Sequence, residues 1–234
     1  MSTDQASRPR SVVLVHGMWG VPGDWQWVQR LLEEHGVQVS VADLPSHRRS
    51  DAGLLDDVEE VRAMLRTAGA PTVAVGWSYG CDVIGVAAAG EPNVARLVYV
   101  SSVPLPLHPG PRDGSIFDDS PIIDWVGDDR FVISDAWRVG RDFAPEVWAF
   151  ADANPKRPVT RRTLTDPIAA TAWAGIPTTV LLGTRDDLFG AQARAFAREA
   201  VRDVREFASD HFIPFSLPGL VAGVILEEIP TRTD

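Results

Sequence analysis

A serine between two glycines is the first feature of this sequence that could do chemistry. It lies in Gly-Trp-Ser-Tyr-Gly, residues 76–80, after an apolar β-branched run and before an alanine-rich apolar segment. This order predicts a sharp strand-to-helix turn with Ser78 at its apex, where small flanking residues avoid clashes with the neighbouring strand and helix. Ser78 is therefore a candidate nucleophile. A purely structural turn is the alternative, because so short a motif also occurs by chance.

A serine hydroxyl needs a histidine to take its proton and an acid to orient that histidine. His211, in Ser-Asp-His-Phe, follows the last predicted strand, so we expect it at the same edge of the sheet as Ser78. The other histidines are interpreted as a packed turn residue (His16), a surface residue at a helix end (His35) and two loop residues that are more often solvated (His47 and His108). A pocket position for His108 stays open.

Two candidate acids follow the fifth predicted strand, in Gly-Thr-Arg-Asp-Asp. Either Asp186 or Asp187 could orient the histidine, and the other could cap a helix. The order Ser78, then an acid, then His211 is one of the known chain orders of such triads.

Alternating strands and helices must position these side chains. Apolar β-branched runs predict strands over residues 11–17, 37–45, 71–77, 94–103, 177–183 and 203–209. Helical spacing and end signals predict helices over residues 24–36, 54–69, 79–90, 191–201 and 217–229. The alternation predicts an α/β fold with a mostly parallel six-stranded sheet and helices on both faces.

Residues 104–176 interrupt this alternation. They are rich in Pro, Asp and Trp and show no strong strand pattern. A segment of this length is too long for a plain loop. We therefore predict a helical cap over 104–176, inserted into a core domain formed by residues 1–103 and 177–234.

Composition excludes several classes of partner. The chain of 234 residues carries a formal net charge of -10, which disfavours nucleic acid and anionic membranes. Its single cysteine, Cys81, excludes an internal disulfide and favours a reducing compartment. Residues 1–10 read as a polar tail without a signal core, and no run reaches the roughly 18 apolar residues of a membrane span. We expect a cytoplasmic protein that acts on a small molecule, and the oligomeric state stays open.

Five short segments in a fixed order make the chain resemble the α/β-hydrolase superfamily from residue 12 to about residue 229. They are Leu-Val-His-Gly-Met-Trp-Gly, Val-Ala-Asp-Leu-Pro-Ser-His, Gly-Trp-Ser-Tyr-Gly, Gly-Thr-Arg-Asp and Ser-Asp-His-Phe. Within that superfamily the chain is similar to small serine esterases of the plant methyl-esterase and hydroxynitrile-lyase group and their bacterial relatives. Residues 157–189 resemble the cap exit of those bacterial relatives.

The resemblance implies roles for individual residues. It favours Asp186 over Asp187 as the acid, because the fourth residue of Gly-Thr-Arg-Asp holds that place in the family. It implies that the backbone N–H groups of Met18 and Tyr79 form an oxyanion hole. It gives His16 a structural role.

Three departures from the family pattern bear on the chemistry. Trp77 stands where a histidine is usual before the serine, and Cys81 stands where a glycine is common. Hydroxynitrile lyases resemble this chain but carry a lysine directly after the catalytic histidine. That position is Phe212 here, and the only lysine is Lys156, in the predicted cap. Cyanohydrin cleavage is therefore disfavoured.

The expected chemistry is acyl transfer to water, with Ser78, Asp186 and His211 as the triad and no metal or organic cofactor. We expect an apolar pocket and a small hydrophobic ester as substrate. Candidate lining residues are Trp19, Trp77, Trp125, Trp137 and Phe212.

Two alternatives use the same scaffold. One is a lyase or cyclase in which Ser78 and His211 act as acid and base without an acyl-enzyme. The other is a ligand sensor that keeps the triad but turns over slowly.

Overall fold

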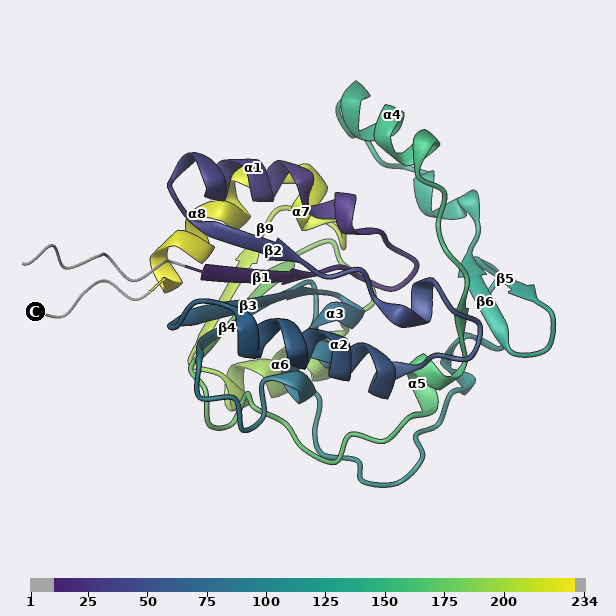
Figure 1. Cartoon of the computed structure of the whole chain (residues 1–234). Coiled ribbons are helices and arrows are strands. Elements are labelled where there is room, and N and C mark those ends of the chain that lie inside the picture. Colours follow the sequence, from purple (N-terminus) through teal and green to yellow (C-terminus); the bar gives the residue numbers. More distant parts are fainter. Residues whose placement is uncertain (1–10, 230–234) are drawn as a thin grey trace, which may run out of the picture.

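A computed structural model of the chain describes residues 11–229 and contains a six-stranded, fully parallel sheet (Figure 1). The strand order is β2-β1-β3-β4-β8-β9. The strands are β1 (Ser11–Val15), β2 (Gln38–Val41), β3 (Thr72–Trp77), β4 (Val94–Val100), β8 (Thr178–Gly183) and β9 (Asp203–Phe207). The predicted six-stranded α/β sheet is confirmed. The predicted polar tail lies outside the described residues.

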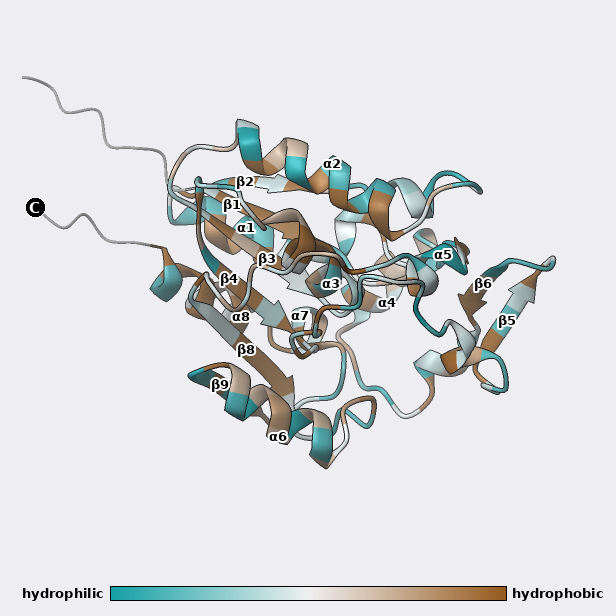
Figure 2. Ribbon diagram, turned by 90° about the horizontal axis from the view of Figure 1, so that it is seen from below, coloured by the Kyte–Doolittle hydropathy of each residue, from teal (hydrophilic) through white to brown (hydrophobic). Residues whose placement is uncertain are grey.

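Helices cover both faces of this sheet. On one face lie α1 (Gln26–Glu34), α7 (Ile213–Ser216) and α8 (Pro218–Glu228), and on the other lie α2 (Leu54–Thr67), α3 (Tyr79–Ala87) and α6 (Ala191–Ala200). Along α2 and α6, hydrophobic and hydrophilic residues alternate (Figure 2). This pattern lets each helix pack one face on the sheet and leave the other in water.

The central strands are buried on both sides, which explains why they read as continuous apolar runs. In β1, Val12 and Leu14 join the core under α1 and α8, whereas Val13 and Val15 join the core under α2 and α3. Successive side chains of a strand point to opposite faces, so a strand covered twice needs apolar residues at every position.

The insertion between β4 and β8 is mixed rather than helical. It contains η3 (Ser115–Phe117), η4 (Asp135–Arg138), α4 (Pro145–Ala153), α5 (Arg162–Thr165) and an antiparallel sheet of β5 (Ile123–Val126), β6 (Arg130–Ile133) and β7 (Val159–Thr160). The predicted helical cap thus contains a small antiparallel sheet that the sequence did not predict. Each of these strands has two to four residues, and their common core is only Ile123, Phe131 and Val159. So few buried positions leave no periodic pattern to read.

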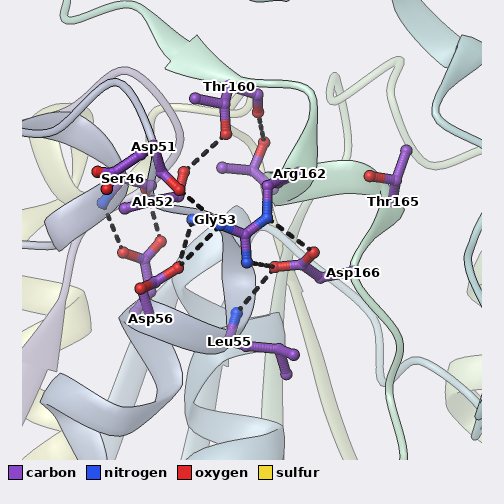
Figure 3. A network of polar contacts seen from close by, with 12 residues as sticks. Ser46, Asp51, Ala52, Gly53, Leu55, Asp56, Thr160, Arg162, Thr165 and Asp166 are labelled. Carbon is purple, nitrogen blue, oxygen red and sulfur yellow. Dashed lines mark hydrogen bonds and ion pairs between the residues drawn. The ribbon is translucent and has the colours of Figure 1, made fainter.

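The insertion lies at the end of the sheet toward which the strands point (Figure 1). Residues 157–166 of the insertion are fastened to the core (Figure 3). Arg162 forms ion pairs with Asp166 at 3.3 Å and with Asp56 at 3.4 Å. The hydroxyl of Thr160 donates to the carbonyl oxygen of Ala52 at 2.6 Å. The boundaries at residues 104 and 176 stay a prediction.

No helix within residues 11–229 is both long enough and apolar enough to cross a bilayer.

Candidate active site

The strand order of the sheet changes direction where β1 and β3 end. These two strands are neighbours in the sheet. After β1 the chain adds β2 on one side of it, and it then returns to add β3 and β4 on the other side. Such a switch point is where open α/β sheets bind ligands, outside the carboxyl ends of the strands. His16 to Met18 follow β1 at this point, and Ser78 follows β3.

Ser78 adopts a strained backbone conformation at the apex of the turn between β3 and α3. Its φ is 53° and its ψ is -121°, in the region that non-glycine residues rarely adopt. A Cβ at Gly76 would lie 2.5 Å from the backbone nitrogen of Cys81, and one at Gly80 would overlap the carbonyl oxygen of Val15. The two glycines therefore allow the sharp turn that presents the half-buried Ser78 side chain.

The loop after β1 lies directly against this turn. A Cβ at Gly17 would be 3.3 Å from the Cβ of Ser78. Within residues 11–229, the backbone N–H groups of Met18 and Tyr79 have no hydrogen-bond partner. Tyr79 is the first residue of α3, where helical N–H groups are left free for an anion. The arrangement thus offers two unpaired donors beside the serine.

Asp186 and His211 form a direct hydrogen bond at the same edge of the sheet. His211 Nδ1 lies 2.8 Å from Asp186 Oδ2, and the other carboxylate oxygen accepts the N–H of Leu188 at 3.1 Å. Asp186 is 4% exposed, whereas Asp187 is exposed and lies outside this pair. Because Nδ1 donates to the carboxylate, Nε2 of the neutral ring is left as a proton acceptor.

Trp77 links the histidine loop to the strand that carries the serine. Its indole N–H donates to the carbonyl oxygen of His211 at 2.9 Å, and the two rings are 6.2 Å apart. Within the described part of the chain, Ser78 and His211 form no direct hydrogen bond. Catalytic hydrogen bonds of free enzymes are often long and shorten only when substrate binds.

A family comparison adds to this geometry. The model of the alpha/beta hydrolase family matches residues 12–224. The chain belongs to the α/β-hydrolase family. No curated protein matches it.

Solved structures share the hydrolase fold with this chain. A pyrethroid hydrolase from Sphingobium faniae JZ-2 superposes with a TM-score of 0.71 at 17% identity, covering 93% of this chain and 96% of that one. The methylesterase protein MES16 from Arabidopsis gives 0.75 at 16% identity, covering 93% and 97%. Polyneuridine aldehyde esterase gives 0.74 at 17% identity, covering 94% and 99%. At these identities the likeness shows the fold alone.

In this α/β-hydrolase, the five candidate pocket residues fall into two aromatic groups. The first group is Trp19, Phe117, Trp125 and Phe131, with ring centroids 5.4–5.9 Å apart, and Met18 packs against it. The second group is Trp77, Trp137, Phe212 and Phe215, where Phe212 follows His211 directly.

The first group thus lies beside Met18, which carries one of the two free N–H groups, and the second lies beside the histidine. Trp77, Trp137 and Phe212 are 3–7% exposed, so most of their surface is used in packing. The lining roles of these residues stay predictions.

Two of the cavities among the described residues are lined by neither Ser78 nor His211. One of about 510 Å³ lies at the opposite end of the strands, between Arg96, Thr178 and Asp203. The other, of about 410 Å³, lies inside the insertion and includes Trp137 and Lys156 in its wall. In residues 11–229, no three His, Cys, Asp or Glu side chains gather as a metal site would require.

The structure corrects the expectation for one histidine. His47 is 4% exposed rather than solvated, and its ring packs edge-on against His16 with centroids 4.6 Å apart. Burial lowers the pKa of both imidazoles, so both are neutral at pH 7. His16 is packed and hydrogen-bonded, and His35 is exposed, as the sequence predicted.

Sequence reasoning missed two polar residues near the site. Lys156, the only lysine, comes from the insertion but lies 6.0 Å from the Trp77 ring and 3.9 Å from the buried carboxylate of Asp24. Asp57 is fully buried on α2, beneath Tyr79. The sequence did contain an indication that Asp57 is buried, because it lies four residues before Val61 and therefore on the apolar face of the helix.

Proposed function

We propose that the protein is a carboxylic ester hydrolase that works through an acyl-enzyme on Ser78. The observation that carries this proposal is the strained serine beside two free N–H groups, together with the Asp186–His211 hydrogen bond at the same edge of the sheet. Membership of the α/β-hydrolase family supports it, and so do the similar folds of a methylesterase and a pyrethroid hydrolase.

The reaction begins when His211 Nε2 takes the hydroxyl proton of Ser78 and Oγ adds to the ester carbonyl. The N–H groups of Met18 and Tyr79 bind the oxyanion that forms, and loss of one such donor costs about a hundredfold or more in rate. Asp186 stays ionised and stabilises the imidazolium. His211 then gives its proton to the leaving alcohol, and later activates the water that releases the acid.

The substrate we propose is a small hydrophobic ester, held between the two aromatic groups. Met18 adjoins the first group and His211 adjoins the second, so a carbonyl at Ser78 would extend its acyl and alcohol parts toward rings. Aromatic rings bind apolar and aromatic groups over large areas with little loss of side-chain entropy.

The direct test is the hydrolysis of a short-chain aryl ester, with trapping of the acyl adduct by acid quenching and mass spectrometry. We expect an acyl group on the peptide that contains Ser78, and loss of hydrolysis in Ser78→Ala. Ser115→Ala is the control, because Ser115 is an exposed serine in the insertion. Unchanged hydrolysis in Ser78→Ala would contradict the proposal.

The same experiment separates the alternatives. Conversion of a substrate without an acyl adduct would favour acid–base chemistry by Ser78 and His211, as in a lyase or cyclase. Tight binding of an ester or acid with negligible turnover would favour a ligand sensor.

A further inference from the structure

Asp57 is a buried carboxylate that the proposed reaction does not use. It lies in the first turn of α2 and has no exposed surface. Its Oδ2 accepts hydrogen bonds from the hydroxyls of Tyr79 at 2.7 Å and Ser46 at 2.6 Å. Its Oδ1 accepts the backbone N–H of Ser46 at 2.8 Å. Three donors from two other segments therefore converge on one carboxylate.

The surroundings of Asp57 contain hydrogen-bond donors but no ion-pair partner among residues 11–229. Its neighbour Asp56 faces the other way and pairs with Arg49 and Arg162. Burial raises the pKa of Asp57 to about 6, although the hydrogen bonds from Ser46 act in the opposite direction. A buried charge without a cation costs free energy, and an apolar residue would suit this helix face better. The role of the Asp57 carboxylate is therefore indicated by the groups that are hydrogen-bonded to it.

The first segment that Asp57 holds begins at Tyr79. This residue follows Ser78 directly and starts α3, and its backbone N–H is one of the two proposed oxyanion donors. Its ring is buried, and its hydroxyl donates a hydrogen bond to Asp57. Because the ring is rigid, this hydrogen bond fixes the first turn of α3 relative to α2.

The second segment that Asp57 holds is η2 (Pro45–His47), which follows β2 and connects the carboxylate to the loop after β1. Ser46 gives its hydroxyl proton to Asp57, so the 2.9 Å hydrogen bond between Ser46 Oγ and His47 Nδ1 is donated by the imidazole. The His47 ring packs against His16, whose Nδ1 lies 3.0 Å from the carbonyl oxygen of Gly17. Gly17 directly precedes the other proposed oxyanion donor.

We propose that Asp57 is a positioning residue for the oxyanion hole, because this one carboxylate anchors both backbone segments that would bind the oxyanion. It acts through Tyr79 on one side and through Ser46, His47 and His16 on the other. The proposal rests on the proposed function, since an oxyanion develops only during acyl transfer. It assigns the buried network a role in the transition state rather than in substrate binding.

The test compares two conservative variants with two matched controls. Tyr79→Phe removes only the hydroxyl that reaches Asp57, and Asp57→Asn keeps the side-chain shape but removes the charge. Tyr99→Phe controls for the first, because Tyr99 is the other tyrosine of the chain and is 1% exposed. Asp56→Asn controls for the second, because it removes a charge from the adjacent position.

Two measurements report the oxyanion hole separately from substrate binding. One is the steady-state kinetics of aryl ester hydrolysis, with rates expressed per active site titrated by a fluorophosphonate. The other is inhibition by an aryl trifluoromethyl ketone. Ser78 Oγ adds to the ketone carbon, its proton passes to His211, and the ketone oxygen becomes an oxyanion that needs the same two N–H groups. Thermal melting of each variant reports the fold.

For Tyr79→Phe and Asp57→Asn we expect kcat to fall about tenfold to a hundredfold, as misplaced catalytic groups typically cause. The affinity for the ketone should fall by the same factor, while KM stays within about twofold. The kcat of the double variant Tyr79→Phe/Asp57→Asn should fall no further than that of the more impaired single variant, because both changes remove the same hydrogen bond. Tyr99→Phe and Asp56→Asn should keep wild-type kcat and ketone affinity.

Wild-type kcat and ketone affinity in both Tyr79→Phe and Asp57→Asn would overturn the positioning role alone. Equal losses in the variants and their controls would overturn it as well, because they would indicate a general packing defect. A wild-type protein that neither hydrolyses esters nor reacts with the fluorophosphonate would overturn the proposed function, and the positioning role with it.

Discussion

Two buried carboxylates reach the region of Ser78, and they differ in what they touch. Asp186 contacts the imidazole of His211 at 2.8 Å, and the side chain of His211 is 13% exposed. Asp57 contacts only hydroxyl and backbone donors from Tyr79 and Ser46, and it is sealed from solvent.

The partners explain how each carboxylate can contribute. An imidazole can gain a proton during a reaction, so the negative charge of Asp186 can stabilise the positive charge that forms on His211. Hydroxyl and amide donors keep the same charge throughout, so Asp57 can only hold them in place. We infer that one carboxylate serves the proton transfer and the other serves the geometry.

The largest effect that can test this contrast is expected from Asp186→Asn. The amide would favour the wrong tautomer of His211 and would not stabilise the imidazolium, so kcat should fall by up to about ten-thousandfold. Initial rates of aryl ester hydrolysis measure the loss.

Asp187→Asn is the matched control, because Asp187 is adjacent in sequence and exposed. It should retain kcat within about twofold, as surface substitutions usually do. A smaller loss in Asp186→Asn than in Asp187→Asn would reverse the assignment of the acid.

The two carboxylates also differ in how readable they were from the sequence. Asp186 and His211 follow predicted strands in recognisable loops, and a strand end fixes where the next side chain lies. Asp57 reads as one of several acids in the first turn of a helix, a position that the helix dipole favours for any of them. Its burial depends on Tyr79 and Ser46, which meet it only in three dimensions.

The core and the insertion also differ in how well the sequence pattern predicted their structure. Buried strands such as β1 and β3 are apolar at nearly every position, so their place in the fold could be predicted. In the insertion, β5 buries only Ile123 and β6 only Phe131. His47 is followed by Arg48 and Arg49, which made its buried ring look like part of a solvated loop.

A second and smaller effect concerns the pH dependence of stability. Because burial raises the pKa of Asp57 from 3.8 to about 6, the folded protein holds this proton more tightly than the unfolded chain. The wild type therefore loses stability relative to Asp57→Asn as pH rises from about 4 to about 6, by roughly 3 kcal/mol in total. Urea unfolding of both proteins across this range measures the difference.

The groups that act on Asp57 are the Tyr79 phenol from α3, Ser46 from η2 (Pro45–His47) with His47 hydrogen-bonded to it, and the charge of the neighbouring Asp56 on α2. The difference between wild type and variant isolates Asp57, because all the other groups are common to both proteins. A difference that does not change between pH 4 and pH 7 would mean that Asp57 titrates in the folded protein as it does in the unfolded chain.

The smallest effect is expected where a carboxylate beside Asp57 is paired at the surface. Asp56 contacts Arg162 at 3.4 Å, and the Arg162 side chain is 45% exposed (Figure 3). Water screens such a pair, and Asp166 keeps its hydrogen bond from the backbone N–H of Leu55 at 3.2 Å. Arg162→Ala should therefore cost less than about 1 kcal/mol in urea unfolding, and about 1 M NaCl should reduce that cost further. Hydrolysis should keep the wild-type kcat. A loss of several kcal/mol, or a fall in kcat like that of Asp57→Asn, would mean that the surface network also sets the geometry of the site, and the distinction between the buried and the exposed carboxylate would then fail.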